Sequence, residues 1–104
     1  MNNHFGLSNI ELQKIRKFLS DYLKIKNRFS ISVFGSRATG SFRQYSDLDL
    51  WIDAEPPLTR KEVSKLEDLF EESDLPIKVD IVTKQTCLPE YKERIAKEKM
   101  FWFS

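Results

Sequence analysis

The chain has 104 residues, of which 40% are hydrophobic and 32% are charged, and its formal net charge is +1. This length suits a single small domain, and Lys and Arg are spread among Asp and Glu, so we expect no basic surface that would attract nucleic acid. No apolar run approaches the about 20 residues of a membrane helix, the N-terminus lacks the apolar core of a signal peptide, and the single Cys87 excludes an internal disulfide, so we expect a cytoplasmic protein.

The first predicted element is a helix over about residues 8–26. Ser8 and Glu11 have the spacing of a capping box, in which each side chain hydrogen-bonds a backbone N–H group at the helix start. Apolar residues then recur at helical spacing: Leu12, Ile15, Leu19 and Tyr22. The apolar run Ser30–Phe34 predicts a buried strand that ends at Gly35. Small and polar residues over 36–45 predict a turn that leads into a short helix.

Residues 47–53 alternate between two kinds of side chain, which predicts a second strand. One face carries Asp47, Asp49, Trp51 and Asp53, and the other carries Leu48, Leu50 and Ile52. Pro56 and Pro57 end this strand.

The second half of the chain predicts two more helices and a third strand. Thr59 and Glu62 repeat the capping-box spacing at the start of a helix near 59–73. Ile77, Val79 and Ile81 alternate with their neighbours as in a strand, and Pro89 suits the first turn of a last helix whose face includes Leu88, Tyr91, Ile95 and Trp102. The order α-β-(α)-β-α-β-α predicts one α/β domain over residues 1–104 but leaves the strand directions open.

Three aspartates predict a metal site. Asp47 and Asp49 lie on one strand face with Cα atoms about 6.5–7 Å apart, close enough to share one cation or to bridge two. Mg²⁺ prefers such carboxylate oxygens. Asp80 is the expected third ligand, since its neighbours Val79 and Ile81 should face the core. With two metals, one would activate an attacking hydroxyl, whose proton Asp80 would help to accept, and the other would neutralise a leaving pyrophosphate.

The Gly35 turn predicts the other half of the site. Glycine lets the backbone approach a phosphate closely, and the following amides and the Ser36 hydroxyl can donate to phosphate oxygens. Arg37 could add charge to the same anion. No Gly-Lys-Ser/Thr follows, so the turn is not a Walker loop. A solvated strand face with an ordinary turn is the structural alternative for these residues.

The pattern Gly35-Ser36, ten residues, Asp47-x-Asp49 and a later strand with Asp80 resembles the nucleotidyltransferase superfamily that includes DNA polymerase beta. The resemblance covers about residues 29–83, and the small size is similar to that of the minimal nucleotidyltransferases (MNT) of HEPN/MNT toxin–antitoxin pairs. It implies a small mixed sheet with flanking helices. It also implies two Mg²⁺ ions bound by the three aspartates, and contacts from Gly35 and Ser36 to the phosphates of ATP.

The same resemblance implies an activity and a partner. Such proteins transfer AMP from ATP to a tyrosine of a HEPN-type ribonuclease toxin and so act as antitoxins. Many relatives have an Arg where this chain has Thr39 and an acidic residue where it has Ser41, which weakens the expectation for triphosphate affinity more than that for metal binding. Arg43 could compensate.

Two other functions remain open at this point. One is an antitoxin that neutralises its partner by binding alone, and the other is a small-molecule nucleotidyltransferase with a separate acceptor-binding subunit. The aromatic segment 100–103 either contacts the partner or completes the core.

Overall fold

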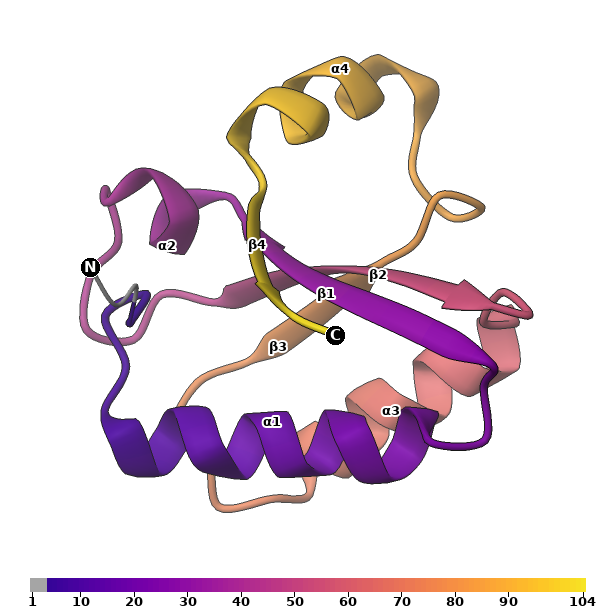
Figure 1. Ribbon diagram of the computed structural model, residues 1–104. Helices are drawn as coiled ribbons and strands as arrows, with labels where there is room; N and C mark the ends of the chain where they lie inside the picture. The colour runs from indigo at the N-terminus through magenta and orange to yellow at the C-terminus, as the bar shows by residue number, and fades with distance from the viewer. Residues whose placement is uncertain (1–3) are drawn as a thin grey trace.

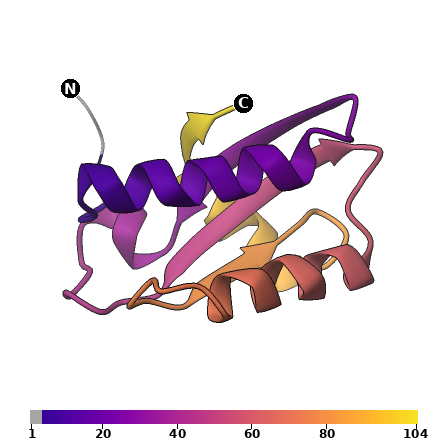
Figure 2. The ribbon, with the colours of Figure 1, turned by 90° about the horizontal axis from the view of Figure 1, so that it is seen from below.

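In the computed structural model, which describes residues 4–104, the chain folds into a four-stranded sheet with helices on both faces (Figure 1). Helices α1 and α3 lie across one face of the sheet, as the view from below shows (Figure 2), while α2 and α4 lie on the other side. The elements in chain order are α1 (Asn9–Leu23), β1 (Arg28–Phe34), α2 (Ser36–Thr39), β2 (Leu48–Glu55), α3 (Arg60–Glu71), β3 (Val79–Val82), α4 (Pro89–Glu98) and β4 (Met100–Phe103). No helix among these residues is long and apolar enough to cross a membrane.

The sheet is mixed, as the family resemblance implied. Its strand order is β3-β2-β1-β4, with β1 antiparallel to both of its neighbours and β2 parallel to β3. The main core lies between the sheet and helices α1 and α3. It contains the predicted apolar face of β2 and apolar side chains of β1 and both helices. The fully buried members include Ile15, Leu19, Leu23, Ile31, Val33, Leu48, Leu50 and Leu66.

Both predicted capping boxes are present. The Ser8 hydroxyl accepts from the Glu11 N–H at 3.1 Å while the Glu11 carboxylate accepts from the Ser8 N–H at 3.0 Å, and Thr59 and Glu62 make the same reciprocal pair. Helix α1 ends at Leu23 rather than near residue 26. Leu23 is its last buried side chain, whereas Ile25 is 74% exposed and would gain little from continuing the helix.

The C-terminal residues form a fourth strand that the sequence pattern did not predict. Helix α4 ends at Glu98, and residues 100–103 pair antiparallel with β1, so the placement of Trp102 on a helix face was wrong. Phe103 is buried and its ring lies 6.2 Å from that of Phe29, whereas Phe101 stays exposed. This aromatic segment therefore completes the sheet and part of the core.

Candidate active site

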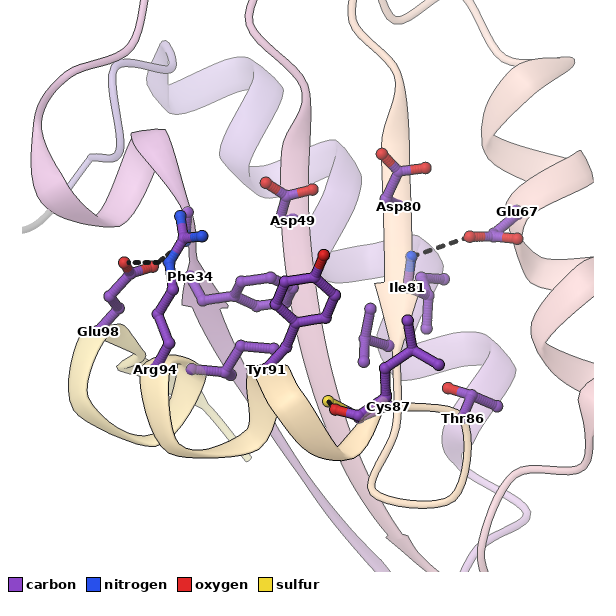
Figure 3. Close-up of a pocket in the computed structure, with 14 residues that line it drawn as sticks. Phe34, Asp49, Glu67, Asp80, Ile81, Thr86, Cys87, Tyr91, Arg94 and Glu98 are labelled. Carbon is purple, nitrogen blue, oxygen red and sulfur yellow. Dashed lines mark hydrogen bonds and ion pairs between the residues drawn. The ribbon is translucent and has the colours of Figure 1, made fainter.

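Three neighbouring strands place Phe34, Asp49 and Asp80 in one row across the sheet. Asp49 of β2 is the register partner of Phe34 in antiparallel β1 and of Asp80 in parallel β3. Figure 3 shows both carboxylates projecting from adjacent strands on the same side of the sheet. Like charges directly opposite each other destabilise a sheet, so this pair is costly unless a cation neutralises it.

Gly35 lies directly against the Asp49 carboxylate. Its φ of +74° is a left-handed conformation that other residues adopt only with strain, and a Cβ at this position would overlap an Asp49 carboxylate oxygen. The backbone conformation therefore favours glycine here, and a Cβ would displace the Asp49 carboxylate. The result is a backbone turn in contact with the charged pair.

The electrostatics of Asp49 show how unfavourable the uncompensated charges are. Burial is the main cause that raises its pKa, and the charges of Asp80, Asp47 and Glu98 add to it, so that the pKa reaches about 6. The ammonium group of Lys78, 3.4 Å from an Asp80 oxygen, acts in the opposite direction. An oxygen donor set with this much unbalanced negative charge fits a divalent cation such as Mg²⁺.

A cleft of about 460 Å³ opens between this row and helix α4. Asp49 and Asp80 line it from the sheet, and Tyr91, Arg94 and Glu98 line it from α4 (Figure 3). The Glu98 carboxylate accepts a hydrogen bond from the Gly35 backbone N–H at 3.3 Å, and the Arg94 Nε donates to its other oxygen at 3.0 Å. The turn, the two carboxylates and one face of α4 thus share a single cavity.

Comparison with known proteins places this arrangement in a family. The model of the family described as "Nucleotidyltransferase domain" matches residues 12–102. The chain belongs to this family. The matched region includes Gly35, both strand aspartates and helix α4, so the whole cleft lies within the nucleotidyltransferase domain.

Two curated relatives carry the provisional name protein adenylyltransferase. MntA of Haemophilus influenzae is 41% identical over 69 residues, which are 66% of this chain and 60% of that protein. MJ1217 of Methanocaldococcus jannaschii is 32% identical over 91 residues and covers 88% of this chain and 89% of its own length. The chain thus spans less than two thirds of MntA and most of MJ1217.

Solved structures agree on the fold. A protein described provisionally as a minimal nucleotidyltransferase superposes with a TM-score of 0.62 at 30% identity, covering 89% of this chain and 95% of its own. A chain from a toxin–antitoxin crystal structure with AMP-PNP superposes with a TM-score of 0.71 at 23% identity, covering 88% of this chain and 73% of its own. The nucleotidyltransferase fold inferred from the sequence is therefore confirmed.

Asp47, one of the three predicted metal ligands, lies at the edge of the site. Asp47 precedes β2 and is exposed, and its charge acts on Asp49. Among residues 4–104, no three His, Cys, Asp or Glu side chains form a group that could hold a metal ion as they stand. The structure thus brings Asp49 and Asp80 together, and the joint metal ligation by Asp47, Asp49 and Asp80 stays a prediction.

The Arg37 side chain is buried and does not point where a phosphate ligand was expected. It is only 2% exposed, and its guanidinium donates to three backbone carbonyl oxygens: Phe5 at 2.8 Å, Ser46 at 3.0 Å and Gln44 at 3.2 Å. These bonds hold the loop that leads into β2 and tie it to the N-terminal turn. With its donors engaged and its side chain buried, Arg37 supports the loop and is not turned toward a phosphate.

The sequence patterns did not indicate what helices α4 and α3 contribute to this candidate site. Leu88, Tyr91, Ile95 and Glu98 follow one another at helical spacing, so the sequence could have placed Glu98 on the same helix face as Tyr91. The Ile81 N–H points away from β2, because β3 is an edge strand, and it donates to the Glu67 carboxylate at 2.9 Å. This bond anchors the strand segment that carries Asp80.

Proposed function

We propose that this chain is an Mg²⁺-dependent protein adenylyltransferase that transfers AMP from ATP to a tyrosine of a HEPN-type ribonuclease toxin and thereby acts as its antitoxin. The observation that carries the proposal is the pairing of Asp49 with Asp80 beside the Gly35 turn. Membership of the nucleotidyltransferase family and the names of MntA and MJ1217 support the reaction class. The fold match to a chain of a toxin–antitoxin complex agrees with the partner.

In this proposal the aspartates and the Gly35 turn have separate tasks. Asp49 and Asp80, with Asp47, would hold Mg²⁺, which supplies charge neutralisation for the phosphates and acidifies the attacking hydroxyl. The Gly35 N–H and the Ser36 hydroxyl donate to phosphate oxygens. As the acceptor oxygen bonds to the α-phosphorus, the bond to pyrophosphate breaks, and in this proposal Asp80 helps to accept the hydroxyl proton.

Tyr91 offers a surface for the nucleobase. Its side chain is 47% exposed in the cleft, and no stacked ring contact involves it among residues 4–104. An aromatic face in this position can stack on a base of any identity. Stacking would orient the adenosine while the phosphates reach the Gly35 turn.

A labelling experiment tests the proposed function. The protein is incubated with Mg²⁺, ATP labelled at the α-phosphate and the co-expressed HEPN-type ribonuclease, and the label is followed on the ribonuclease. We expect labelling with the wild type and with Asp53→Asn, an exposed carboxylate on the same strand, and none with Asp49→Asn or Asp80→Asn. Mass spectrometry of the labelled ribonuclease should locate AMP on a tyrosine.

The same experiment distinguishes the main alternative. ATP labelled at the γ-phosphate should give no labelled ribonuclease, since that phosphate leaves with pyrophosphate. If the ribonuclease is inhibited equally by the wild type and by Asp80→Asn, and neither labels it, the chain is an antitoxin that acts by binding. Absence of both labelling and inhibition would refute the antitoxin function altogether.

A further inference from the structure

The Glu98 carboxylate binds the Gly35 N–H, the same group that the proposed function assigns to a phosphate oxygen. It is held there by the Gly35 N–H at 3.3 Å on one oxygen and by the Arg94 Nε at 3.0 Å on the other. The side chain is only 21% exposed and lies close enough to Asp49 for the two charges to repel each other. A carboxylate oxygen and a phosphate oxygen accept from a backbone N–H in the same way.

The cleft contains a marked excess of negative charge. Four carboxylates line it, from Asp49, Glu67, Asp80 and Glu98, whereas Arg94 is the single Lys or Arg among the described residues that do so. Arg37 is buried and does not line the cleft. A polyphosphate bound in this cleft therefore needs a protein cation, and Arg94 is in place to provide it.

A second ion pair on the same helix, between Lys97 and Glu93, serves as a comparison because it lies on the exposed surface. Lys97 and Glu93 also stand four residues apart, at 3.3 Å, but both side chains are more than three-quarters exposed and neither lines the cleft. Pairs of this kind contribute little to stability. The Arg94–Glu98 pair differs because its carboxylate is only 21% exposed and also accepts from the Gly35 N–H, although the Arg94 side chain itself is 67% exposed.

We propose that Arg94 and Glu98 form an exchange pair for the nucleotide phosphates. In the free protein Glu98 binds the Gly35 N–H and Arg94; when ATP binds, a phosphate oxygen replaces Glu98 on the turn and Arg94 turns from Glu98 to the phosphates. Glu98 thereby lowers the affinity for ATP, and Arg94 raises it. This inference rests on the proposed function and names the residues that select a polyphosphate at the same site.

Calorimetric titration with Mg²⁺ and ATP tests the exchange. Glu98→Gln keeps an oxygen for the Gly35 N–H but loses the charge, so we expect ATP to bind about three- to tenfold more tightly. Arg94→Gln should weaken binding about tenfold or more. Glu93→Gln and Lys97→Gln make the same charge changes outside the cleft and should stay within about twofold of the wild type.

The double variant separates a phosphate contact from an indirect role of Arg94. If Arg94 contacts the phosphates, adding Arg94→Gln to Glu98→Gln should again weaken binding about tenfold. If Arg94 only holds Glu98, the second substitution should have no effect, and the assignment of Arg94 is wrong. Circular dichroism spectra identical to that of the wild type establish that each variant is folded.

An NMR measurement reports on the turn without any catalysis. The Gly35 amide resonance of Glu98→Gln should differ from that of the wild type, and the resonance of the wild type should shift when ATP is added. Glu93→Gln should leave the resonance unchanged. If the wild type binds ATP and labels its partner, yet Glu98→Gln and Arg94→Gln match their controls, the exchange is refuted and the proposed function stands. If no form of the protein binds ATP, both are refuted.

Discussion

Replacing Asp49 by Asn removes a charge that the fold itself opposes. The Asp49 carboxylate is partly buried opposite Asp80, with the charges of Asp47 and Glu98 nearby. Because these surroundings disfavour the ionised form, the folded protein binds a proton at Asp49 more tightly than the unfolded chain does. Asparagine has nearly the same shape and no charge. We therefore expect Asp49→Asn to stabilise the metal-free protein.

The size of the effect follows from the pKa of Asp49, which rises from an ordinary value of 3.8 to about 6. When the pKa of an acid is higher in the folded state, the free energy of unfolding is unaffected at a pH below the pKa of the unfolded chain. It falls progressively as the pH rises from about 4 to about 6, and the full loss is reached at a pH above the pKa of the folded state. The shift corresponds to at most about 3 kcal/mol, and solvent screening of the partly exposed group reduces this to about 1–2 kcal/mol.

Urea unfolding followed by circular dichroism measures this effect. At pH 7.5 the free energy of unfolding of Asp49→Asn should exceed that of the wild type by about 1–2 kcal/mol, and the difference should shrink toward pH 4.5. Asp53→Asn, on an exposed position of the same strand, should stay within about 0.5 kcal/mol at every pH. A destabilised Asp49→Asn, or a stabilisation independent of pH, would show that the Asp49 charge does not oppose folding.

Three further substitutions test separate parts of the site. Gly35→Ala should lower the free energy of unfolding by about 2–4 kcal/mol, and Gly40→Ala by only about 1 kcal/mol, because both have positive φ but only a Cβ at Gly35 meets another group, the Asp49 carboxylate. Arg37→Lys should cost about 2–4 kcal/mol in urea unfolding, since lysine cannot make all three carbonyl bonds; unchanged stability would contradict its structural role. Tyr91→Ala should weaken ATP binding about tenfold in calorimetry while Tyr91→Phe retains it, and equal losses in both would argue against stacking.

The sequence was most informative where one local rule decides the structure. The alternation of residues 47–53 correctly placed Leu48 and Leu50 in the core and left the aspartates on the other face of β2. The capping boxes at Ser8 and Thr59 fixed two helix starts, because the bonds involved span only three residues. These features require no knowledge of distant segments.

Features that depend on tertiary contacts escaped the sequence. Strand β4 is apolar at all four positions and so shows no alternation, and it forms because the free edge of β1 is available to it. Arg37 lies next to Gly35 and Ser36 in the motif, but its direction is set by the carbonyls of Phe5, Gln44 and Ser46, which only the folded loop brings together.

The helix α4 side of the cleft is a similar case. Arg94 and Glu98 have the spacing of an ordinary surface ion pair, and only the position of α4 over the sheet brings them to the Gly35 turn. The apposition of Asp49 and Asp80 was expected in outline. Its register, with the two residues directly opposite each other, comes from the parallel pairing of β2 with β3, which the order of elements left open.

The proposed function requires that the carboxylates of two adjacent strands bind a divalent cation beside the glycine turn. A crystal structure with Mn²⁺ and a non-hydrolysable ATP analogue tests this directly, because anomalous scattering locates the metal. We expect a Mn²⁺ ion bonded to carboxylate oxygens of both Asp49 and Asp80, with a phosphate oxygen on the Gly35 N–H. A bound nucleotide whose metal contacts neither aspartate would show that these carboxylates are not the metal ligands.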